Sequence, residues 1–529
     1  MLPRDFIGRC ARSFPEKIAY IDGDRKRTWK EMDERSDALS AALQGLGVDK
    51  GDVVAVLAQD RVEVFEHFFA CMKTGALRTG INWRYSEREM THIVRDSDAK
   101  VIIVQAECVD LLAEHLPTLR EEGRHVIGFG EGHGLPLDYE TLLGEAGEPE
   151  SPQLKDDDFI AISYTSGTTG LPKGAMLTQK GVRASLTHTT LAIGLRHEDV
   201  WASVFPLAGI TLLIGCFNLV NGMTIVLPDG YFKPRRFLEL VEENGITSTI
   251  LVPTMLKQVT EEQQEHPHDT STLRLMAYGS MPATPAMIRE ALETFGCGFQ
   301  HWYGATEGTG GWYAFLLEDD HRKALEEEPE LLTSCGRPLL HMEMSIRDEE
   351  GNELPPGEVG EVWVAGDTVM AGYLNQPEET EEVIEGRWLK TGDMGRFDER
   401  GYLYLGDRKK FLIITGGYNV YPVVVENALA EHPEVREVTV LGVPHPDWGE
   451  AVVAAVVPAP EAEVSSGELI NFCRDKVGRF EVPKHVEIME ELPKGVTAKV
   501  QKHEVRAYFE EHSEALPWEI GETSGNARV

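Results

Sequence analysis

Few of the features that mark secreted, membrane or metal-bound proteins occur in this sequence. It has only seven cysteines in 529 residues, widely spaced and without a Cys-x-x-Cys pair, so neither a disulfide framework nor a zinc site is indicated. Charged residues interrupt the first twelve positions, where a signal peptide would need an apolar stretch. We therefore expect a protein of the reducing cytoplasm.

Basic charge is also scarce, with 51 Lys and Arg against 88 Asp and Glu and a net charge of −37. Such a field repels nucleic-acid phosphates and anionic lipid surfaces, which excludes nucleic acid as the main partner. One uncharged stretch, residues 200–228, is long enough to cross a bilayer, but proline, glycine and asparagine interrupt it repeatedly. We expect an internal apolar wall or pocket there and no membrane span.

The composition is that of a folded protein, with 42% hydrophobic and 26% charged residues. Short apolar runs separated by helical patterns predict an α/β fold. The expected buried strands are residues 53–57, 101–104, 159–164, 224–227 and 249–252. A helix is predicted after Thr28, because Thr28 and Glu31 have the spacing of a capping box.

The pattern changes toward the C-terminus, where closely spaced Gly and Pro separate short strands from about residue 330. A charged run at residues 407–410 then precedes a new α/β pattern. We therefore predict a large N-terminal domain over residues 1–406, made of α/β subdomains with a β-rich subdomain at about 330–406. A hinge at 407–410 and a small α+β C-terminal domain at 411–529 would follow.

The most informative stretch is Tyr164–Gly174, which reads Y-T-S-G-T-T-G-L-P-K-G directly after a predicted strand. Its hydroxyl side chains and glycines supply many donors to an anion that approaches the backbone closely. A polyphosphate is therefore the expected ligand. The stretch is not a Walker A loop, because Pro172 stands where that motif needs glycine.

This stretch resembles the phosphate loop of the adenylate-forming (ANL) superfamily, which includes acyl-CoA synthetases, luciferases and nonribosomal-peptide adenylation domains. Further motifs similar to those of the family follow in the same order, over nearly the whole chain. They are Y-G-A-T-E at 303–307, G-E-V-G-E at 357–361, L-K-T-G-D at 389–393, D-R-K-K at 407–410 and L-P-K-G-V-T-A-K at 492–499.

The resemblance implies an AMP-forming acid–thiol ligase that uses ATP, Mg²⁺ and coenzyme A. Lys499 would bridge the substrate carboxylate and the α-phosphate, which repel each other. Glu307 would hold Mg²⁺, and Thr306 and Thr168 would donate to phosphate. The remaining phosphate-loop residues that the resemblance implies are Thr165, Ser166, Gly167, Thr169, Gly170 and Lys173.

The resemblance also implies a nucleoside site and a moving C-terminal domain. Asp393, assisted by Arg408, would accept hydrogen bonds from the ribose hydroxyls. Gly279 and Ser280 correspond to the adenine loop, and Tyr303 and Gly304 would lie beside the base. The small domain would rotate about Lys410 between the two half-reactions, and Gly416 and Gly417 would then line the tunnel for the thiol arm of coenzyme A.

The segment that lines the acid pocket departs from the family pattern, which has an aromatic residue and a histidine after Pro-Leu. This chain has Ala208 and Gly209 there, which widens the pocket and removes a polar group. We therefore predict a bulky hydrophobic carboxylic acid as the substrate. The predicted pocket residues are Pro206, Ala208, Gly209, Leu213 and Gly304.

Three alternatives stay open from the sequence. A ligase that only transfers a preformed acyl-adenylate to coenzyme A would also fit the weakened acid pocket. A stand-alone adenylation enzyme could load a carrier protein in trans, and a noncatalytic nucleotide-binding regulator could keep the fold without the reaction. A homodimer is left open as well.

Overall fold

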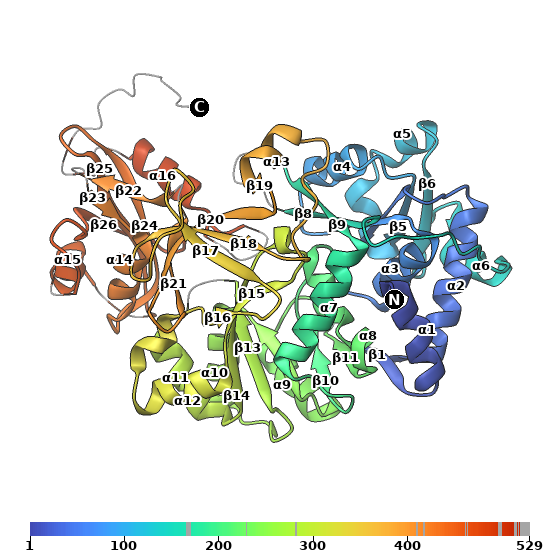
Figure 1. Cartoon of the computed structure of the whole chain (residues 1–529), viewed down its shortest axis with the longest axis horizontal. Coiled ribbons are helices and arrows are strands. Elements are labelled where there is room, and N and C mark those ends of the chain that lie inside the picture. The colour runs from blue at the N-terminus through green and yellow to red at the C-terminus, as the bar shows by residue number, and fades with distance from the viewer. Residues whose placement is uncertain are drawn as a thin grey trace. The chain divides into compact units, whose positions relative to one another are not determined.

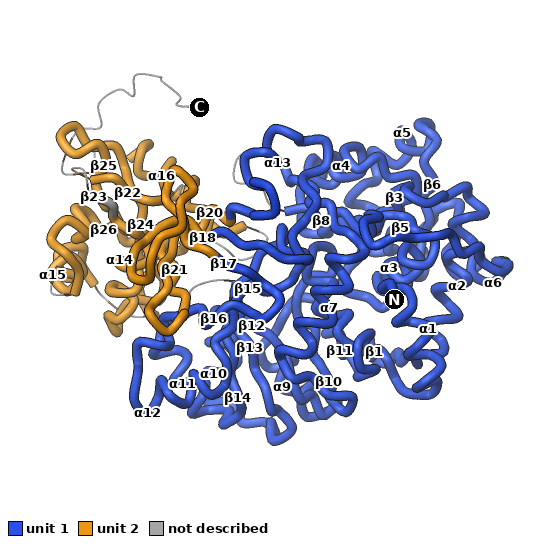
Figure 2. Tube along the Cα trace, viewed as in Figure 1, with its two compact units in different colours: residues 1–344, 363–390 blue, residues 345–362, 391–529 orange. Residues whose placement is uncertain are grey.

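A computed structural model of the chain describes residues 1–165, 171–228, 230–280, 283–408, 411–415, 418–460, 462, 464–474, 476–495, 500–512, 516 and 518 (Figure 1). The chain divides into two compact units (Figure 2). The larger unit comprises Met1–Met344 and Trp363–Lys390, and the smaller comprises Ser345–Val362 and Thr391–Val529.

A seven-stranded sheet in the order β7-β6-β5-β3-β4-β8-β9 forms the first part of the larger unit. Its strands pair in parallel except for β8 and β9, which are antiparallel. The strands are β3 (Val53–Ala58), β4 (Leu77–Asn82), β5 (Val101–Gln105), β6 (His125–Phe129), β7 (Leu137–Asp138), β8 (Phe159–Thr165) and β9 (Lys173–Thr178). Helices α2 (Trp29–Gly45), α3 (Val62–Thr74), α4 (Glu87–Asp96), α5 (Leu116–Glu121) and α6 (Tyr139–Glu145) and the 3₁₀ helix η1 (Ala106–Leu112) accompany it.

A nine-stranded sheet in the order β16-β15-β14-β13-β12-β10-β11-β1-β2 forms the second part. The six strands from β14 to β1 in this order pair in parallel. The strands are β1 (Ile18–Asp22), β2 (Arg25–Thr28), β10 (Val200–Ala202), β11 (Thr224–Leu227), β12 (Ser248–Leu251), β13 (Leu275–Gly279), β14 (Gly298–Gly304), β15 (Trp312–Leu316) and β16 (Arg337–Pro338). Its helices are α1 (Pro3–Ser13), α7 (Gln179–Ile193), η2 (Ile210–Cys216), α8 (Asn218–Asn221), α9 (Pro234–Asn244), α10 (Pro253–Glu265), α11 (Pro285–Phe295), η3 (Thr306–Gly308), α12 (Glu318–Glu326) and η4 (Pro329–Thr333).

Two five-stranded sheets follow. The first has the order β17-β18-β20-β19 with β21 beside β20, and the second has the order β23-β22-β25-β24 with β26 beside β25. Their strands are β17 (Glu343–Arg347), β18 (Gly360–Ala365), β19 (Ile384–Glu385), β20 (Trp388–Phe397), β21 (Leu403–Arg408), β22 (Ile413–Thr415), β23 (Tyr418–Val420), β24 (Val435–His445), β25 (Gly449–Pro458) and β26 (His485–Ile488). The helices are α13 (Pro377–Val383), α14 (Pro422–Ala430), α15 (Ser466–Arg474) and α16 (Lys502–Glu511).

The predicted elements form where the sequence pattern indicates them. All five expected strands are present as β3, β5, β8, β11 and β12. The capping box at the start of α2 is also confirmed, since Thr28 Oγ1 accepts from Glu31 N (3.2 Å) and Glu31 Oε2 accepts from Thr28 N (2.7 Å). The predicted fold class, an α/β protein with a large N-terminal and a small C-terminal part, is confirmed. The exact boundaries at 406 and 411 stay a prediction.

The uncharged stretch at residues 200–228 is divided among β10, η2, α8 and β11. Among the residues that the structure describes, no helix has both the length and the apolar character needed to span a membrane.

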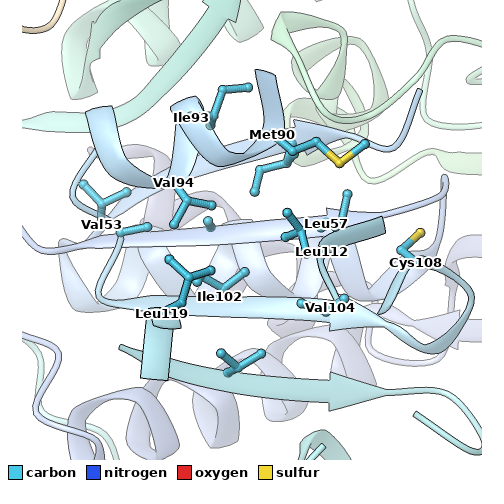
Figure 3. Close-up of a cluster of buried hydrophobic side chains, with 14 of the residues drawn as sticks. Val53, Leu57, Met90, Ile93, Val94, Ile102, Val104, Cys108, Leu112 and Leu119 are labelled. Carbon is cyan, nitrogen blue, oxygen red and sulfur yellow. The ribbon is translucent and has the colours of Figure 1, made fainter. Parts of the chain in front are cut away.

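One hydrophobic core lies on a single face of the seven-stranded sheet (Figure 3). Val53 and Leu57 of β3 and Ile102 of β5 contribute to it, and Met90 and Ile93 of α4 pack over them. The continuous burial of β3 on both faces is typical of a parallel strand covered by helices. Residues that alternate with these core residues, such as Val54 and Val56 of β3, are buried on the opposite face of the sheet.

This core predicts a large effect of a cavity at Leu57, which is 0% exposed. We expect Leu57→Ala to lower the free energy of unfolding by about 2–5 kcal/mol, because burial is lost and a cavity remains. The matched control is Leu191→Ala, since Leu191 is 80% exposed and its replacement should change stability by less than about 0.5 kcal/mol. Urea unfolding followed by circular dichroism compares the two, and equal losses would contradict the assignment of the core.

Candidate functional site

The predicted phosphate loop is the connection between the antiparallel strands β8 and β9. Thr165 ends β8 and faces Lys173, the first residue of β9, across the ladder. Ser166, Gly167, Thr168, Thr169 and Gly170 lie outside the described residues. The two ends of the loop are thus held by paired strands at the edge of the sheet.

The free edge of β9 is covered by residues 370–374, a segment far away in the sequence. Ala371 N donates to Met176 O (2.9 Å), Met176 N donates to Gly372 O (2.9 Å), and Leu374 N donates to Gly174 O (2.8 Å). At its start, Met370 N donates to the backbone oxygen of Glu307 (2.8 Å). This segment therefore connects the edge of the seven-stranded sheet to η3, which follows β14 of the nine-stranded sheet.

The same segment carries the side chain that holds Glu307. Tyr373 donates its hydroxyl to Glu307 Oε1 at 2.8 Å. Lys173 Nζ lies 5.5 Å from the centroid of the Tyr373 ring and forms an ion pair with Glu379. Lys173 and Glu307, both predicted from the sequence, are therefore brought together through Tyr373, while Glu379 holds the lysine from the other side.

Glu307 is suited to a phosphate-bound magnesium ion more than to a metal site made only of protein. Within the described ranges, no three His, Cys, Asp or Glu side chains gather as a metal cluster. Mg²⁺ in nucleotide enzymes is commonly held by one or two carboxylates together with substrate phosphates. One oriented carboxylate near the phosphate loop fits that donor set.

The predicted nucleoside residues of the larger unit lie at the ends of neighbouring parallel strands. Gly279 ends β13 opposite Trp302 of β14, and Tyr303 and Gly304 follow directly. A β-carbon at Gly279 would stand 2.3 Å from Trp302 O, so glycine is required at this close approach. Ser280 has a left-handed backbone with φ 67°. Ligands of α/β sheets bind at such carboxyl ends.

In the smaller unit, Asp393 of β20 lies opposite Arg408 of β21 in the antiparallel ladder. Its neighbour Gly392 donates its N–H to Glu361 Oε1 (3.2 Å), which belongs to the predicted G-E-V-G-E motif. Asp393 N also donates to Thr391 Oγ1 (3.1 Å). The register thus brings together the two residues that the resemblance assigns to the ribose.

Four further predicted residues lie outside the described part of the chain. They are Lys410, Gly416, Gly417 and Lys499. Strands β22 and β23 flank the two glycines and pair through Thr415 and Tyr418.

The predicted acid-pocket segment is held at Leu207 by Asp60, which follows β3, and by Arg78 of β4. Leu207 N donates to Asp60 Oδ1 (2.7 Å), and Leu207 O accepts from Arg78 Nη2 (2.6 Å). Gly209 and Leu213 line a cavity of about 10 Å³, whereas Pro206, Ala208 and Gly304 are not among its lining residues. No atom lies within 4 Å of the position that a β-carbon at Gly209 would take.

Sequence reasoning missed Tyr373, Glu379, Asp60 and Arg78. Tyr373 and Glu379 stand outside every recognised motif, and in sequence they resemble surface residues. Arg78 carried a detectable signal, because a lone arginine interrupts the otherwise uncharged stretch 74–83 that forms β4. Arginine side chains are seldom fully buried unless they are paired.

The anchor at Leu207 predicts a pH effect. Burial raises the pKa of Asp60 to about 6, although the Leu207 N–H favours the ionised form. In the unfolded chain the pKa of this carboxyl is near 4. Between about pH 4 and pH 6 the folded state therefore binds more protons than the unfolded state. The free energy of unfolding falls as pH rises through this window. Asp60→Asn removes that component. Urea unfolding at pH 4, 5, 6 and 7 should show the variant gaining stability relative to the wild type, and a constant difference would contradict this.

Two family models match the chain, "AMP-binding enzyme" over residues 7–374 and "AMP-binding enzyme C-terminal domain" over residues 424–499. A feruloyl-CoA synthase of Amycolatopsis sp is 33% identical, with 95% of this chain and 98% of the relative covered. A fatty acid–[acyl-carrier-protein] ligase, ScoC, of Streptomyces coeruleorubidus is 32% identical, with 94% and 95% covered. Among solved structures, the amide bond synthetase McbA from Marinactinospora thermotolerans is 31% identical with a TM-score of 0.86, covering 96% of this chain and 100% of that one.

The family match spans well over half of the chain, and the relatives align along almost their whole length. The order of the motifs and the two-part α/β architecture agree with it. The chain therefore belongs to the AMP-binding enzyme family, within the adenylate-forming superfamily, and it is an enzyme of the ligase class.

Proposed function

We propose that this AMP-forming acid–thiol ligase converts a bulky hydrophobic carboxylic acid, ATP and coenzyme A to the acyl-CoA, AMP and pyrophosphate. The observation that carries the proposal is the contact of Tyr373 with both Glu307 and Lys173, the residue at which β9 begins after the phosphate loop. A cation and an oriented carboxylate beside a loop rich in donors are the groups that ATP and its metal ion need.

In the first step, a carboxylate oxygen of the acid attacks the α-phosphorus, and the bond to pyrophosphate breaks. The two reactants are both anions, so cationic groups must lower their repulsion. We assign that role to Lys499, and we assign donation to the phosphate oxygens to Thr168 and Thr306. Magnesium bound at Glu307 would neutralise charge on the phosphates when present.

We propose the nucleoside assignments that the family resemblance implies. Gly279 and Ser280 would contact the adenine, with Tyr303 packed beside it, and Asp393 with Arg408 would bind the ribose hydroxyls. An ionised carboxylate has acceptors for two hydroxyl donors, which suits Asp393 to that task.

In the second step, the thiol sulfur of coenzyme A attacks the acyl carbonyl carbon, the thiol proton is lost and AMP leaves. We propose that residues 411–529 rotate about Lys410 between the two steps and that Gly416 and Gly417 then line the thiol tunnel. Two adjacent glycines lack the side chains that would narrow such a passage.

The proposed acid is bulky and largely apolar, because the segment from Ile210 onward is apolar and nothing occupies the space beside Gly209. Transfer to a carrier protein is the second candidate, since one relative is named as an acyl-carrier-protein ligase. The two candidates share the adenylation step and differ only in the thiol that accepts the acyl group.

The test is a panel of carboxylic acids with ATP, Mg²⁺ and coenzyme A, in which AMP and pyrophosphate are measured separately. We expect release of both with bulky apolar acids and little with acetate. Release of pyrophosphate without AMP would favour a carrier protein as the acceptor. Release of neither product with any acid would contradict the proposal. If a synthetic acyl-adenylate and coenzyme A still gave thioester in that case, the protein would be the transfer-only enzyme.

Lys499→Ala should lower acid-dependent pyrophosphate release about 10²- to 10³-fold, because one preorganised cation at the developing charge is lost. The matched control in the same motif is Lys494→Ala, since Lys494 forms an ion pair with Glu437 (2.6 Å) and is 35% exposed. The control should retain the wild-type rate within about twofold. An unchanged rate for Lys499→Ala would remove the assignment.

Tyr373 is a positioning residue in this proposal, and it can be tested through the metal requirement. Tyr373→Phe removes the hydrogen bond to a charged acceptor, which corresponds to about a tenfold effect. We expect the Mg²⁺ concentration for half-maximal rate to rise by that factor while KM for the acid stays constant. Tyr231→Phe is the control because Tyr231 is 61% exposed. A change in KM for the acid alone would contradict this role.

A further inference from the structure

Arg78 is a buried cation whose charge is not balanced by any described carboxylate. Its side chain is 2% exposed on β4, and within the described residues its one hydrogen bond runs from Nη2 to Leu207 O (2.6 Å). Its Nε is buried and makes no hydrogen bond. A buried, unpaired charge costs several kcal/mol, so its presence calls for an explanation.

Other buried charged side chains that the structure describes form ion pairs or hydrogen bonds with oppositely charged groups. Glu66, whose side chain is 0% exposed, accepts hydrogen bonds from Arg35 Nε (2.6 Å) and from the hydroxyl of Tyr139 (2.9 Å). Asp199 accepts from Arg274 Nε (2.7 Å) with a side chain that is 4% exposed. Arg78 differs from these residues because no described carboxylate pairs with it.

The surroundings of Arg78 do not supply a counter-charge. Burial lowers its pKa to about 10, and the only groups that oppose this are the thiols of Cys71 and Cys216. His67 is kept neutral, because burial first and Arg78 second lower its pKa to about 3. The guanidinium is therefore charged at neutral pH, and no carboxylate among the described residues pairs with it.

Arg78 lies on the sheet face opposite the core of Figure 3, directly under the acid-pocket segment. It pairs in register with Ala161 of β8, and Gly80 and Ser163, two residues further along each strand, lie on the same face. The guanidinium folds over Gly80, where a β-carbon would stand 2.3 Å from Nη2 and 2.1 Å from Ala208 O. Glycine at 80 thus makes room for both groups.

A small cavity joins this guanidinium to Gly209. Arg78, Ser163 and Gly209 line it, and the 3₁₀ helix η2 closes it with Ile210 and Leu213. The hydroxyl of Ser163 is buried and, like Arg78 Nε, has no hydrogen-bond partner among the described residues. The residues that carry these two unsatisfied donors, Arg78 and Ser163, therefore line one cavity whose other walls are mainly apolar.

The cavity is also close to the phosphate loop. Thr165, the last described residue before the loop, lies two positions beyond Ser163 on the same face of β8, which is about 7 Å along a strand. A carboxylate bound beside Ser163 would thus lie two strand positions short of Thr165, where the loop begins.

We infer that Arg78 and Ser163 form the floor of the acid pocket and bind a carboxylate of the substrate, which rests on the proposed ligase function. A planar guanidinium binds a carboxylate through two parallel hydrogen bonds and supplies the missing counter-charge. The reacting carboxylate must reach the phosphate loop, which begins two strand positions beyond Ser163, so we assign the carboxylate at Arg78 as a second one, at the other end of the acid. The substrate class is then an acid with an apolar body and two carboxylates.

The cavity of about 10 Å³ holds no more than one water molecule, so a carboxylate enters only when η2 moves. The wall that must move consists of Ile210, Leu212 and Leu213, which are apolar and form no hydrogen bond through their side chains. The purely structural role, anchoring Leu207, needs one neutral donor and does not need a buried charge.

The experiment compares Arg78→Gln with Asp60→Asn. Both residues hold the backbone of Leu207, and both substitutions remove the charge. Asparagine keeps an oxygen that accepts from Leu207 N, and glutamine keeps an amide donor on a side chain that is shorter than arginine. The probes are hexanoic, octanoic and decanoic acids and the matching α,ω-dicarboxylic acids, each with ATP, Mg²⁺ and coenzyme A. Pyrophosphate release gives kcat/KM, and thermal unfolding with each acid and ATP gives binding without turnover.

We expect the wild type to prefer a dicarboxylic acid over its monocarboxylic partner at one or more chain lengths by at least about tenfold. Arg78→Gln should lower kcat/KM for that diacid about 10²-fold, abolish the rise in Tm that the diacid causes, and leave the monoacid within about threefold. Asp60→Asn should change both acids by the same small factor. Loss of both acids in Arg78→Gln would overturn the inference, because the monoacid has only the reacting carboxylate.

Two further results would overturn the inference. One is a wild type that prefers the monoacid at every length, and the other is an equal loss in Arg78→Gln and Asp60→Asn, which would make Arg78 a loop anchor only. Failure of the ligase proposal is separate, because it gives no pyrophosphate with any acid while the Tm measurement still reports whether the diacid binds at Arg78.

Discussion

The edge of β9 is the constraint on which the geometry of the site depends. Backbone hydrogen bonds of residues 370–374 complete the ladder of β9, and the same segment reaches the backbone of Glu307. An edge strand has unsatisfied donors and acceptors that must be paired or covered. In this chain, the segment that covers the edge also carries Tyr373. The same segment therefore completes the ladder of β9 and orients the carboxylate of Glu307.

Around this edge, each group is held by the backbone or by a partner from a different element. Lys173 starts β9, Glu307 follows β14, and Glu379 belongs to α13. Their separation in sequence is large, but the interactions that join them are short in space and require rigid elements on both sides. The phosphate loop thus leaves and re-enters the sheet at two fixed points.

The acid-pocket segment is also held by side chains from different elements, but one of them is a buried charge without a carboxylate partner among the described residues. Asp60, which follows the carboxyl end of β3, and Arg78, near the start of β4, hold the two backbone groups of Leu207. Buried charges elsewhere in the chain are paired, whereas the guanidinium of Arg78 keeps donors that no described group satisfies. The contrast makes the face of the sheet opposite the hydrophobic core a chemically distinct surface.

The sequence by itself determined the local elements and the identity of the family. The buried strands, the capping box at Thr28 and the ordered motifs depend on neighbours in the chain, so periodicity and spacing reveal them. Only the tertiary structure decided that Tyr373 holds Glu307, that Glu379 holds Lys173 and that Arg78 lies under Gly209. These contacts join residues brought together by sheet register and strand order, which no local pattern encodes, because the free energy of each contact depends on burial and on a partner far away in the chain.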